Sequence, residues 1–544
     1  MPFFSRRSLL AGAGAGIAGV GLGATVEPTT ASAATLPADA GTAGVANITP
    51  DDSRYQDLLL RGYNRRGTFH PDSFRVVRST AQVVQAVNDA VRTGKQIAVR
   101  SGGHCLELIV DIPEVKVVID FTEMRAVDFD PARNAFVVEA GATLGEVYRR
   151  LDYGWGVTLP GGVCPTVGAG GHIIGGGFGV LSRQYGLISD HLHAVEVVVV
   201  GADRVARAVV ATREANDPNN GLWWAHTGGG GGNFGVVTRF WLRSPGSKGT
   251  DPTRLLPRVP GGVQVGRAVW NWSDLTKDAF IQIARNFGTW MEQNSSPTSP
   301  GRALHANLAA SRIEAGKVTV VGQVDPTVAG NGAILDGFLN AVGAGVPITP
   351  QIVRTAQLPW LSTTIKVPDS AVALGVQGPP RWKSNVSVLR KRYTDQQIAT
   401  AYDYQTRSGY RNTASTFALT SYGGQINALA TGDTATPHRA AIMFAAVSTV
   451  WDDPATDDAN LTWARTFFRD LYAATGGVPV LDEQTDGCPI NWPNVDLLGA
   501  PWNTSPVSAH TLFHGSNYSR LQQIKKKWDP RNIFRHPLSV ELPR

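Results

Sequence analysis

The sequence predicts a two-domain α+β protein, and three observations support this fold class. The chain has 544 residues, which is too many for one ordinary hydrophobic core. Strand-like and helix-like patterns alternate in the first half of the chain, as an α+β arrangement requires. Between residues 245 and 260 the composition changes to Pro, Gly and Arg, which indicates a domain boundary. We therefore expect a first domain over 45–255, a second over 256–490, and a segment over 491–544 that returns to the first.

The first domain is expected to begin with a helix and loop over 51–69 and to continue with strands and helices in turn. Residues 80–93 carry apolar side chains at helical spacing, and a second helix over 142–151 begins at Thr143. Short β-branched runs predict the strands, of which the last two form a hairpin. The predicted strands are 96–100, 115–120, 135–140, 192–200 and 205–211.

The second domain is expected to be a sheet backed by helices. The helix predictions are 273–294 and 395–408, and the strand predictions are 317–324, 415–419 and 440–450. The sequence has no internal repeats and no heptads in this part, which excludes solenoid and coiled-coil architectures.

The composition is that of a globular protein and excludes several classes of function. Hydrophobic residues make up 42% of the chain and charged residues 17%, which is typical of a folded protein. The net charge of +6 is modest and spread out, so nothing indicates nucleic acid as a partner. After residue 33 no apolar run is long enough to span a membrane. No spacing typical of a metal site, a serine-hydrolase elbow or a Walker loop occurs, so no metal is expected.

The first 33 residues have the pattern of a twin-arginine export signal. Ser5-Arg-Arg-Ser-Leu-Leu10 precedes an apolar stretch rich in Ala and Gly, which ends at Ala31-Ser-Ala33. We expect cleavage after Ala33 and a secreted protein with no membrane attachment. Because this pathway moves folded proteins, it suits an enzyme that acquires a cofactor before export.

Two glycine-dense loops dominate the first domain, and each contains one nucleophilic side chain. They are Val99–Cys105, with His104, and Gly161–Gly179, with Cys164. Glycines at such positions permit positive φ and leave backbone N–H groups uncovered, which suits a diphosphate. We interpret His104 and Cys164 as two tethers for one flavin. The alternatives are a histidine that ends a strand and a buried structural cysteine.

These loops and two further stretches carry a family resemblance. The stretches are Arg100–His104, Gly161–His172, Leu222–Val237 and Asn517–Phe534. They resemble the berberine-bridge-enzyme-like branch of the vanillyl-alcohol-oxidase flavoproteins, which includes secreted antibiotic-tailoring oxidases of actinomycetes. The resemblance implies a PCMH-type FAD-binding domain and an antiparallel substrate sheet backed by helices. It also implies covalent FAD, with the flavin 8α-methyl bonded to His104 and C6 bonded to Cys164.

The resemblance further implies a set of residues that bind the cofactor through glycine loops and polar side chains. Besides His104 and Cys164, they are Arg100, Ser101, Gly102, Gly103, Gly168, Gly170, Gly171, His172, Gly177, Gly232, Asn233, Gly235, Val236 and Asn517.

The sequence departs from the family pattern where relatives that oxidise sugar alcohols carry tyrosines near the flavin. Such tyrosines remove the hydroxyl proton while hydride leaves the substrate. The departures are Phe178, Val388, Trp492 and Phe513. We interpret these four residues as a substrate pocket rebuilt with apolar and aromatic groups for a flat conjugated substrate. His514, with an ordinary pKa of ~6.5, and Tyr422 are the expected catalytic groups.

The sequence thus predicts an exported FAD oxidase that acts on a bulky aromatic secondary metabolite. Electrons would pass to the flavin N5 and then to dioxygen, which would give hydrogen peroxide. One alternative is an oxidase of hydroquinones or quinone drugs that confers resistance. Another is a secreted flavoprotein that binds a drug or pigment without catalysis. The identity of the substrate and the oligomeric state stay open.

The chain has three cysteines. With Cys164 assigned to the flavin, Cys105 and Cys488 remain. A disulfide between these two has no geometric support in the sequence, so whether they are free stays open at this point.

Overall fold

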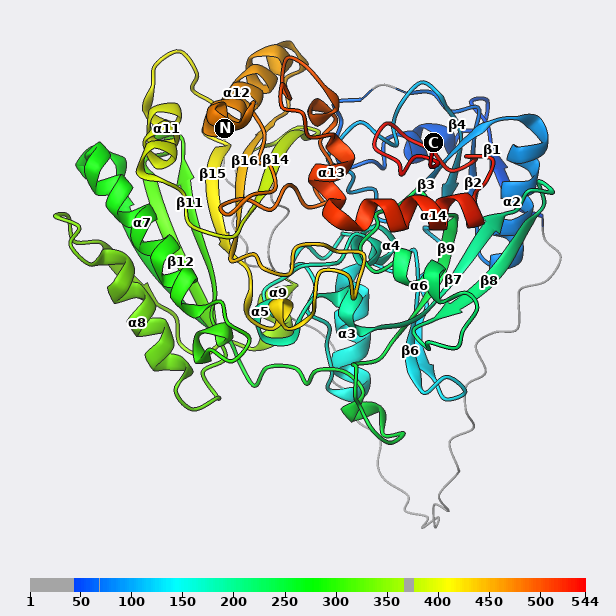
Figure 1. The fold of residues 1–544 in the computed structure, drawn as a ribbon, viewed down its shortest axis with the longest axis horizontal. Helices are drawn as coiled ribbons and strands as arrows, with labels where there is room; N and C mark the ends of the chain where they lie inside the picture. Colours follow the sequence, from blue (N-terminus) through cyan, green and yellow to red (C-terminus); the bar gives the residue numbers. More distant parts are fainter. Residues whose placement is uncertain (1–43, 68, 366–375) are drawn as a thin grey trace, which may run out of the picture. The chain divides into compact units, whose positions relative to one another are not determined.

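The computed structural model of the protein describes residues 44–67, 69–365 and 376–544. The predicted export signal over 1–33 lies outside these residues and stays a prediction. The described strands form three sheets with flanking helices (Figure 1), so the α+β class is confirmed. No helix in the described ranges is both long enough and apolar enough to cross a membrane.

The first sheet has four strands in the order β1-β2-β4-β3 and carries the loop of His104. β2 and β3 run parallel to β4, and β1 runs antiparallel to β2. The helix α2 (Thr80–Thr93) begins where Ser79 Oγ accepts a hydrogen bond from the N–H of Gln82. His104 follows the carboxyl end of β3. The strands are β1 (Ala46–Ile48), β2 (Ser73–Val76), β3 (Gln96–Arg100) and β4 (Val115–Asp120).

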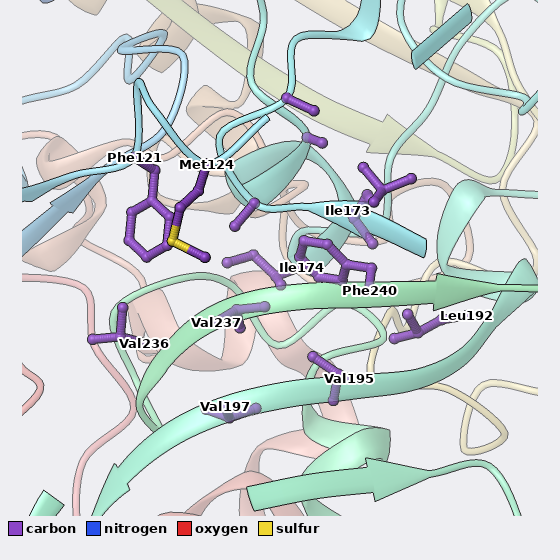
Figure 2. Packing of buried hydrophobic residues seen from close by; sticks show 14 of the residues in the cluster. Phe121, Met124, Ile173, Ile174, Leu192, Val195, Val197, Val236, Val237 and Phe240 are labelled. Atoms are coloured by element: carbon purple, nitrogen blue, oxygen red, sulfur yellow. The ribbon is translucent and has the colours of Figure 1, made fainter. Parts of the chain in front are cut away.

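The second sheet has five antiparallel strands in the order β5-β6-β9-β7-β8, and it supports the loop of Cys164. Figure 2 shows Ile173 and Ile174 of α4 (Ala169–Ile174) packed over Val195, Val237 and Phe240. This packing fixes α4 on the sheet, and the loop that contains Cys164 leads directly into α4. The strands are β5 (Val127–Asp130), β6 (Ala135–Glu139), β7 (Leu192–Val200), β8 (Ala206–Thr212) and β9 (Val236–Leu242).

The third sheet has seven strands in the order β13-β10-β12-β11-β15-β16-β14, and all neighbours are antiparallel. This confirms the predicted antiparallel sheet. The strands are β10 (Gln264–Asn271), β11 (His305–Ser311), β12 (Lys317–Val324), β13 (Gln351–Arg354), β14 (Arg381–Leu389), β15 (Ser415–Ser421) and β16 (Met443–Trp451).

Helices cover one face of this seven-stranded sheet (Figure 1). Because strand residues alternate between faces, Met443, Ala445 and Val447 of β16 pack with the helices. The residues between them point to the opposite face. The helices are α7 (Lys277–Asn294), α8 (Asn331–Gly343), α11 (Asp395–Thr406) and α12 (Asp457–Leu471).

After this sheet the chain returns to the first part of the molecule through α13 (Ala509–His514) and α14 (Tyr518–Trp528). α14 packs on α6 (Asn220–Ala225), and Figure 1 shows it beside α4 and α6. The remaining helices are α1 (Tyr55–Leu59), α3 (Leu144–Trp155), α5 (Ser182–Tyr185) and α9 (Trp360–Thr364). The domain boundaries at 255 and 490 stay predictions.

Three predicted helices have different ends from those expected. The helix predicted over 395–408 is α11, which ends at Thr406. The helix predicted from 273 begins at Lys277, because Thr276 accepts a hydrogen bond from the N–H of Ala279, and residues 272–274 form a 3₁₀ turn instead. The helix predicted over 142–151 is α3, which extends to Trp155. Its start is as expected, because the side chains of Thr143 and Glu146 form a capping box.

Candidate active site

A cavity of about 630 Å³ lies where the glycine loops meet the uncovered face of the seven-stranded sheet. One wall comes from the loops that contain His104 and Cys164 and from residues 230–237. The opposite wall comes from β11, β14, β15 and β16 together with residues 490–493. The cavity therefore joins segments that are far apart in the sequence.

His104 and Cys164 lie in the same corner of this cavity. The Nε2 atom of His104 lies 2.9 Å from the Oγ1 atom of Thr166, and the Sγ atom of Cys164 lies 3.5 Å from the same hydroxyl. The imidazole of His104 stacks on the ring of Tyr63, with ring centroids 4.3 Å apart. Two nucleophiles from separate loops thus face one region of the cavity.

The loop of His104 is held by backbone contacts on both sides. The guanidinium of Arg61 donates to the carbonyl of Ser101 and pairs with the buried carboxylate of Asp120. A Cβ atom at Gly102 would lie 2.2 Å from the backbone nitrogen of Gly168. Only glycine permits this approach, which brings the two loops into direct backbone contact.

The cavity fits a dinucleotide such as FAD. Among the described residues, the backbone N–H groups of Ser101, Gly102 and Gly103 have no protein acceptor, so they are available to a diphosphate. Gly171 lines the cavity, and a Cβ atom built on it would meet no atom within 4 Å, so this glycine faces open space. Backbone donors that face open space are the pattern by which proteins cradle phosphates.

Most of the residues predicted to bind the cofactor line this cavity. Besides His104 and Cys164, they are Arg100, Ser101, Gly102, Gly103, Gly168, Gly170, Gly171, His172, Gly232, Asn233, Gly235 and Val236.

Several of these residues brace the loops. His172 Nε2 accepts a hydrogen bond from the N–H of Gly162, and burial lowers the pKa of His172 to about 4. Arg100 is buried and donates to the carbonyl of Leu58. We therefore expect the glycine backbone, rather than charged side chains, to make most contacts with the phosphates.

Asn233 ties the glycine loop at 229–232 to residues much later in the chain. Its amide donates to the carbonyls of Gly229 and Gly230, and its Oδ1 accepts from the N–H of Val540. The ammonium of Lys525 donates to the carbonyl of Asn233 at 2.7 Å. The third glycine loop thus depends on residues 525–540 for its position.

Two predicted cofactor residues lie elsewhere. Gly177 lines a smaller cavity of about 20 Å³ beside the main one. Asn517 lines neither cavity, because its amide donates to the carbonyls of Thr431, Thr434 and Ala435. Asn517 therefore supports the loop that precedes β16 and does not reach the position predicted for it.

The substrate residues predicted from the family departures are divided between the two cavities. Phe178 and Trp492 line the main cavity on either side of Phe444, with ring centroids 5.1 and 5.7 Å from that of Phe444. Phe513 lines only the smaller cavity. Val388 lines neither, because its strand partner Phe444 and the neighbouring apolar side chains bury it completely. Phe178, Phe444 and Trp492 thus form an aromatic wall of the main cavity, and Val388 is not part of it.

Tyr422 lines the smaller cavity, which shares Phe178, Phe444 and Trp492 with the main one. Its ring lies against Phe444, with centroids 4.5 Å apart. Burial raises the pKa of the Tyr422 hydroxyl, although Arg439 lowers it in part. Tyr422 is therefore a neutral hydroxyl next to the main cavity.

His514 lines neither cavity, so its assignment as a catalytic base gains no support from its position. Its side chain is buried and stacks on Tyr518, and its Nδ1 atom has no hydrogen-bond partner. Burial, together with His510, His438 and His536, lowers the pKa of His514 to about 3. It is a neutral core histidine.

In the unfolded chain His514 takes up a proton below about pH 6.5, whereas in the folded chain it does so only at about pH 3. The free energy of unfolding therefore falls as the pH falls from about 6.5 to about 3. This one group is expected to cost about 2 kcal/mol at about pH 5. His514→Phe keeps the stacked ring and removes the titration, so it should reduce the acid-induced loss of Tm, measured by differential scanning fluorimetry between pH 5 and pH 7. Turnover should be unchanged, and a loss of turnover at neutral pH without a change in Tm would contradict this assignment.

The sequence analysis missed the polar residues on the sheet side of the cavity. They lie at alternate positions of four strands, so they share one face. The Oγ atoms of Ser384 and Ser448 are 2.7 Å apart, and Asn307 donates to Thr420 Oγ1 at 2.8 Å. Burial lowers the pKa of His305, which also lines the cavity, to about 4. The only available signal was the two-residue period of these strands.

Cys105 lines the main cavity and Cys488 is buried, and the structure forms no disulfide between them. Burial raises the pKa of the Cys105 thiol to about 12. Among the described residues no group of three or more His, Cys, Asp or Glu side chains could hold a metal ion.

The fold and the cavity define an FAD-dependent oxidoreductase, and comparison with known proteins agrees. Residues 71–206 match the family described as FAD binding domain, and residues 490–541 match berberine and berberine like. The aclacinomycin-N/aclacinomycin-A oxidase of Streptomyces galilaeus is 46% identical, over 99% of each chain. The chain belongs to the berberine-bridge-enzyme-like FAD-linked oxidases.

Solved structures give the same result. The structure of aclacinomycin oxidoreductase has 47% identity and a TM-score of 0.89, and the match covers 92% of this chain and all of that one. A glycopeptide hexose oxidase complexed with teicoplanin has 44% identity and a TM-score of 0.86, over 92% and 99% of the two chains. The protein is therefore an FAD-dependent oxidase.

Proposed function

We propose that this protein is an exported oxidase that holds FAD through covalent bonds to His104 and Cys164 and oxidises a bulky aromatic secondary metabolite. The observation that carries the proposal is that both nucleophiles reach Thr166 in one corner of a cavity with aromatic side chains on its far wall. Bound FAD would accept two electrons and pass them to dioxygen, which with two protons gives hydrogen peroxide.

Two tethers at one end would leave the rest of the flavin ring open to a large substrate. Tyr63 stacks on His104 and holds its ring, and the Thr166 hydroxyl lies between the imidazole and the thiol. The two bonding positions, 8α-methyl and C6, lie on the same ring of a flavin. One compact pair of nucleophiles can therefore serve both.

The far wall supports a flat substrate with oxygen substituents. Phe178, Phe444 and Trp492 offer ring faces and edges, and Ser384 and Ser448 offer hydroxyl groups beside them. The relatives named above act, by their names, on aclacinomycins and on the hexose of a glycopeptide. A polycyclic or glycosylated metabolite fits a cavity of this size and lining.

The titratable groups on this wall favour a substrate whose hydroxyl is already acidic. The pKa of His305 is lowered to about 4 by burial, and that of Tyr422 is raised by burial. Neither group is poised near neutral pH to remove a proton from an ordinary alcohol. This observation favours a hydroquinone or phenol, so oxidation of the hydroquinone form of a quinone-type drug is the second candidate function.

The test is anaerobic mixing of the purified protein with a panel of aromatic metabolites, glycosides and hydroquinones. A substrate should bleach the visible flavin absorbance, and admission of oxygen should restore it with one hydrogen peroxide for each substrate oxidised. If none of the aromatic compounds bleaches the flavin while they still bind, the proposed substrate class is wrong.

We also propose that the enzyme leaves the cytoplasm through the twin-arginine pathway, because Arg6 and Arg7 precede the apolar leader. Replacing both by lysine should trap folded, flavin-loaded protein in the cytoplasm of an expressing actinomycete. Cell fractionation and immunoblotting measure the distribution. Unchanged export of the lysine variant would rule out this pathway.

A further inference from the structure

One buried lysine on β14 contacts two other segments that form cavity walls. The side chain of Lys383 is 0% exposed. Its ammonium pairs with the carboxylate of Glu107, donates to Asn494 Oδ1 at 2.8 Å, and lies 2.7 Å from Asp496 Oδ2. These partners come from the loop after His104 and from the segment after Trp492.

Each contact lies next to residues that line the cavity. Trp382 and Ser384, the chain neighbours of Lys383, both line it, so Lys383 points to the opposite face of the strand. Glu107 directly follows the lining residues 104–106, and Asn494 directly follows the lining residues 490–493. On the side away from the cavity, the ammonium thus connects three segments. They are the loop that contains His104 (the tether loop), the segment that contains Trp492, and the strand that carries Ser384.

A second contact joins two of the same segments. The amide of Asn64 donates to the carbonyl of Leu106 at 2.8 Å and to that of Trp382 at 3.1 Å, and its Oδ1 accepts from the N–H of Trp382. Asn64 is buried. The tether loop is therefore fixed to β14 at adjacent residues 382 and 383.

The charges explain why Lys383 matters more than its neighbours. Burial alone would raise the pKa of Glu107 and of Asp496. Lys383 and Arg66 together lower the pKa of Glu107 below its usual value, and Lys383 and Arg465 do the same for Asp496. Both carboxylates are therefore ionised, and their mutual repulsion is offset by the ammonium between them. Without it, Glu107 would still pair with Arg66 and Asp496 with Arg465, but no cation would lie between the two carboxylates to hold the tether loop and the Trp492 segment together.

We propose that Lys383 is a positioning residue that sets the gap between the flavin-attachment loop and the substrate wall. The proposal deepens the proposed function and rests on it for the covalent attachment of FAD. Three variants test it in the full chain. Lys383→Met removes the ammonium and Lys383→Arg keeps a cation. Arg312→Met removes a fully buried cation that directly follows β11 and contacts Glu314 and the carbonyls of Tyr404 and Arg407, outside the cavity.

The measurements are the flavin that stays with the acid-precipitated chain, hydrogen–deuterium exchange of peptides over 101–111 and 490–498, and steady-state kinetics. Lys383→Met should lose exchange protection in both peptides, carry several-fold less attached flavin, and lose about 10²-fold in kcat/KM. Lys383→Arg should recover most of this. Arg312→Met should lower Tm without changing flavin or protection.

Asp496→Asn provides a milder variant, expected to lose protection over 490–498 but not over 101–111. The proposal is overturned if Lys383→Met keeps wild-type flavin and protection in both peptides and loses only as much Tm as Arg312→Met. If the wild type itself holds no covalent flavin, the proposed function fails, while the exchange measurement still decides whether Lys383 holds the two segments together.

Discussion

Acid should release all the flavin from the double variant His104→Ala/Cys164→Ala, and essentially none from the wild type. Each tether is a covalent bond that survives unfolding, and the two side chains reach the same hydroxyl of Thr166 from different loops. Either single variant should therefore keep the flavin on the chain. The flavin absorbance of the acid pellet and supernatant measures the outcome.

Thr166→Val is a matched control for this experiment, because it removes the hydroxyl and keeps both nucleophiles. It should slow attachment without abolishing it. Complete release of flavin from the acid-treated wild type would contradict the tether assignment, whereas retention by the double variant would reveal an attachment site other than these two residues.

The kcat/KM for simple sugar alcohols should be ~10²–10⁴-fold lower than that for hydroquinones. A general base usually contributes a factor of this size. The reason is that His305 and Tyr422 have pKa values moved away from neutrality by burial, and the cavity wall has the apolar Trp492 at the position where the family resemblance leads us to expect a tyrosine. Peroxide release under matched substrate concentrations gives the ratio.

Trp492→Tyr returns a hydroxyl to the wall shared by the two cavities and should recover part of the sugar-alcohol activity. Trp492→Phe, which opens the same space without a hydroxyl, should not. A wild type that oxidises a sugar alcohol as fast as a hydroquinone would show that a base has been overlooked, and the interpretation of the aromatic wall would then be wrong.

The elements predicted with correct ends are those in which local pattern and environment agree. Thr80–Thr93 has a cap and one apolar face, and Leu192–Val200 is a continuous β-branched run buried in a sheet. β14 was missed because its buried positions include Lys383, Asn385 and Ser387. These side chains are paired with partners far away in the sequence, so the strand does not show a hydrophobic period.

The same contrast, between local sequence pattern and contacts far apart in the sequence, explains which parts of the site could be predicted. The cofactor side was predictable because contiguous loops, with His104 and Cys164 inside them, supply its residues. The sheet side collects single residues such as His305, Thr420 and Ser384 from three different strands, and only the strand order of the sheet brings them together. The burial of His514 away from both cavities could not be predicted, because a sequence motif does not state which way the short helix α13 faces.

Because the third glycine loop depends on residues 525–540, this loop can take its final position only after those residues have been made. The ribosome makes Asn233 long before Lys525 and Val540, yet its contacts beyond its own loop are with these two residues. A nascent chain therefore carries an incomplete nucleotide pocket until residues 525–540 have been made. A chain truncated before Lys525 is expected to be made without bound flavin.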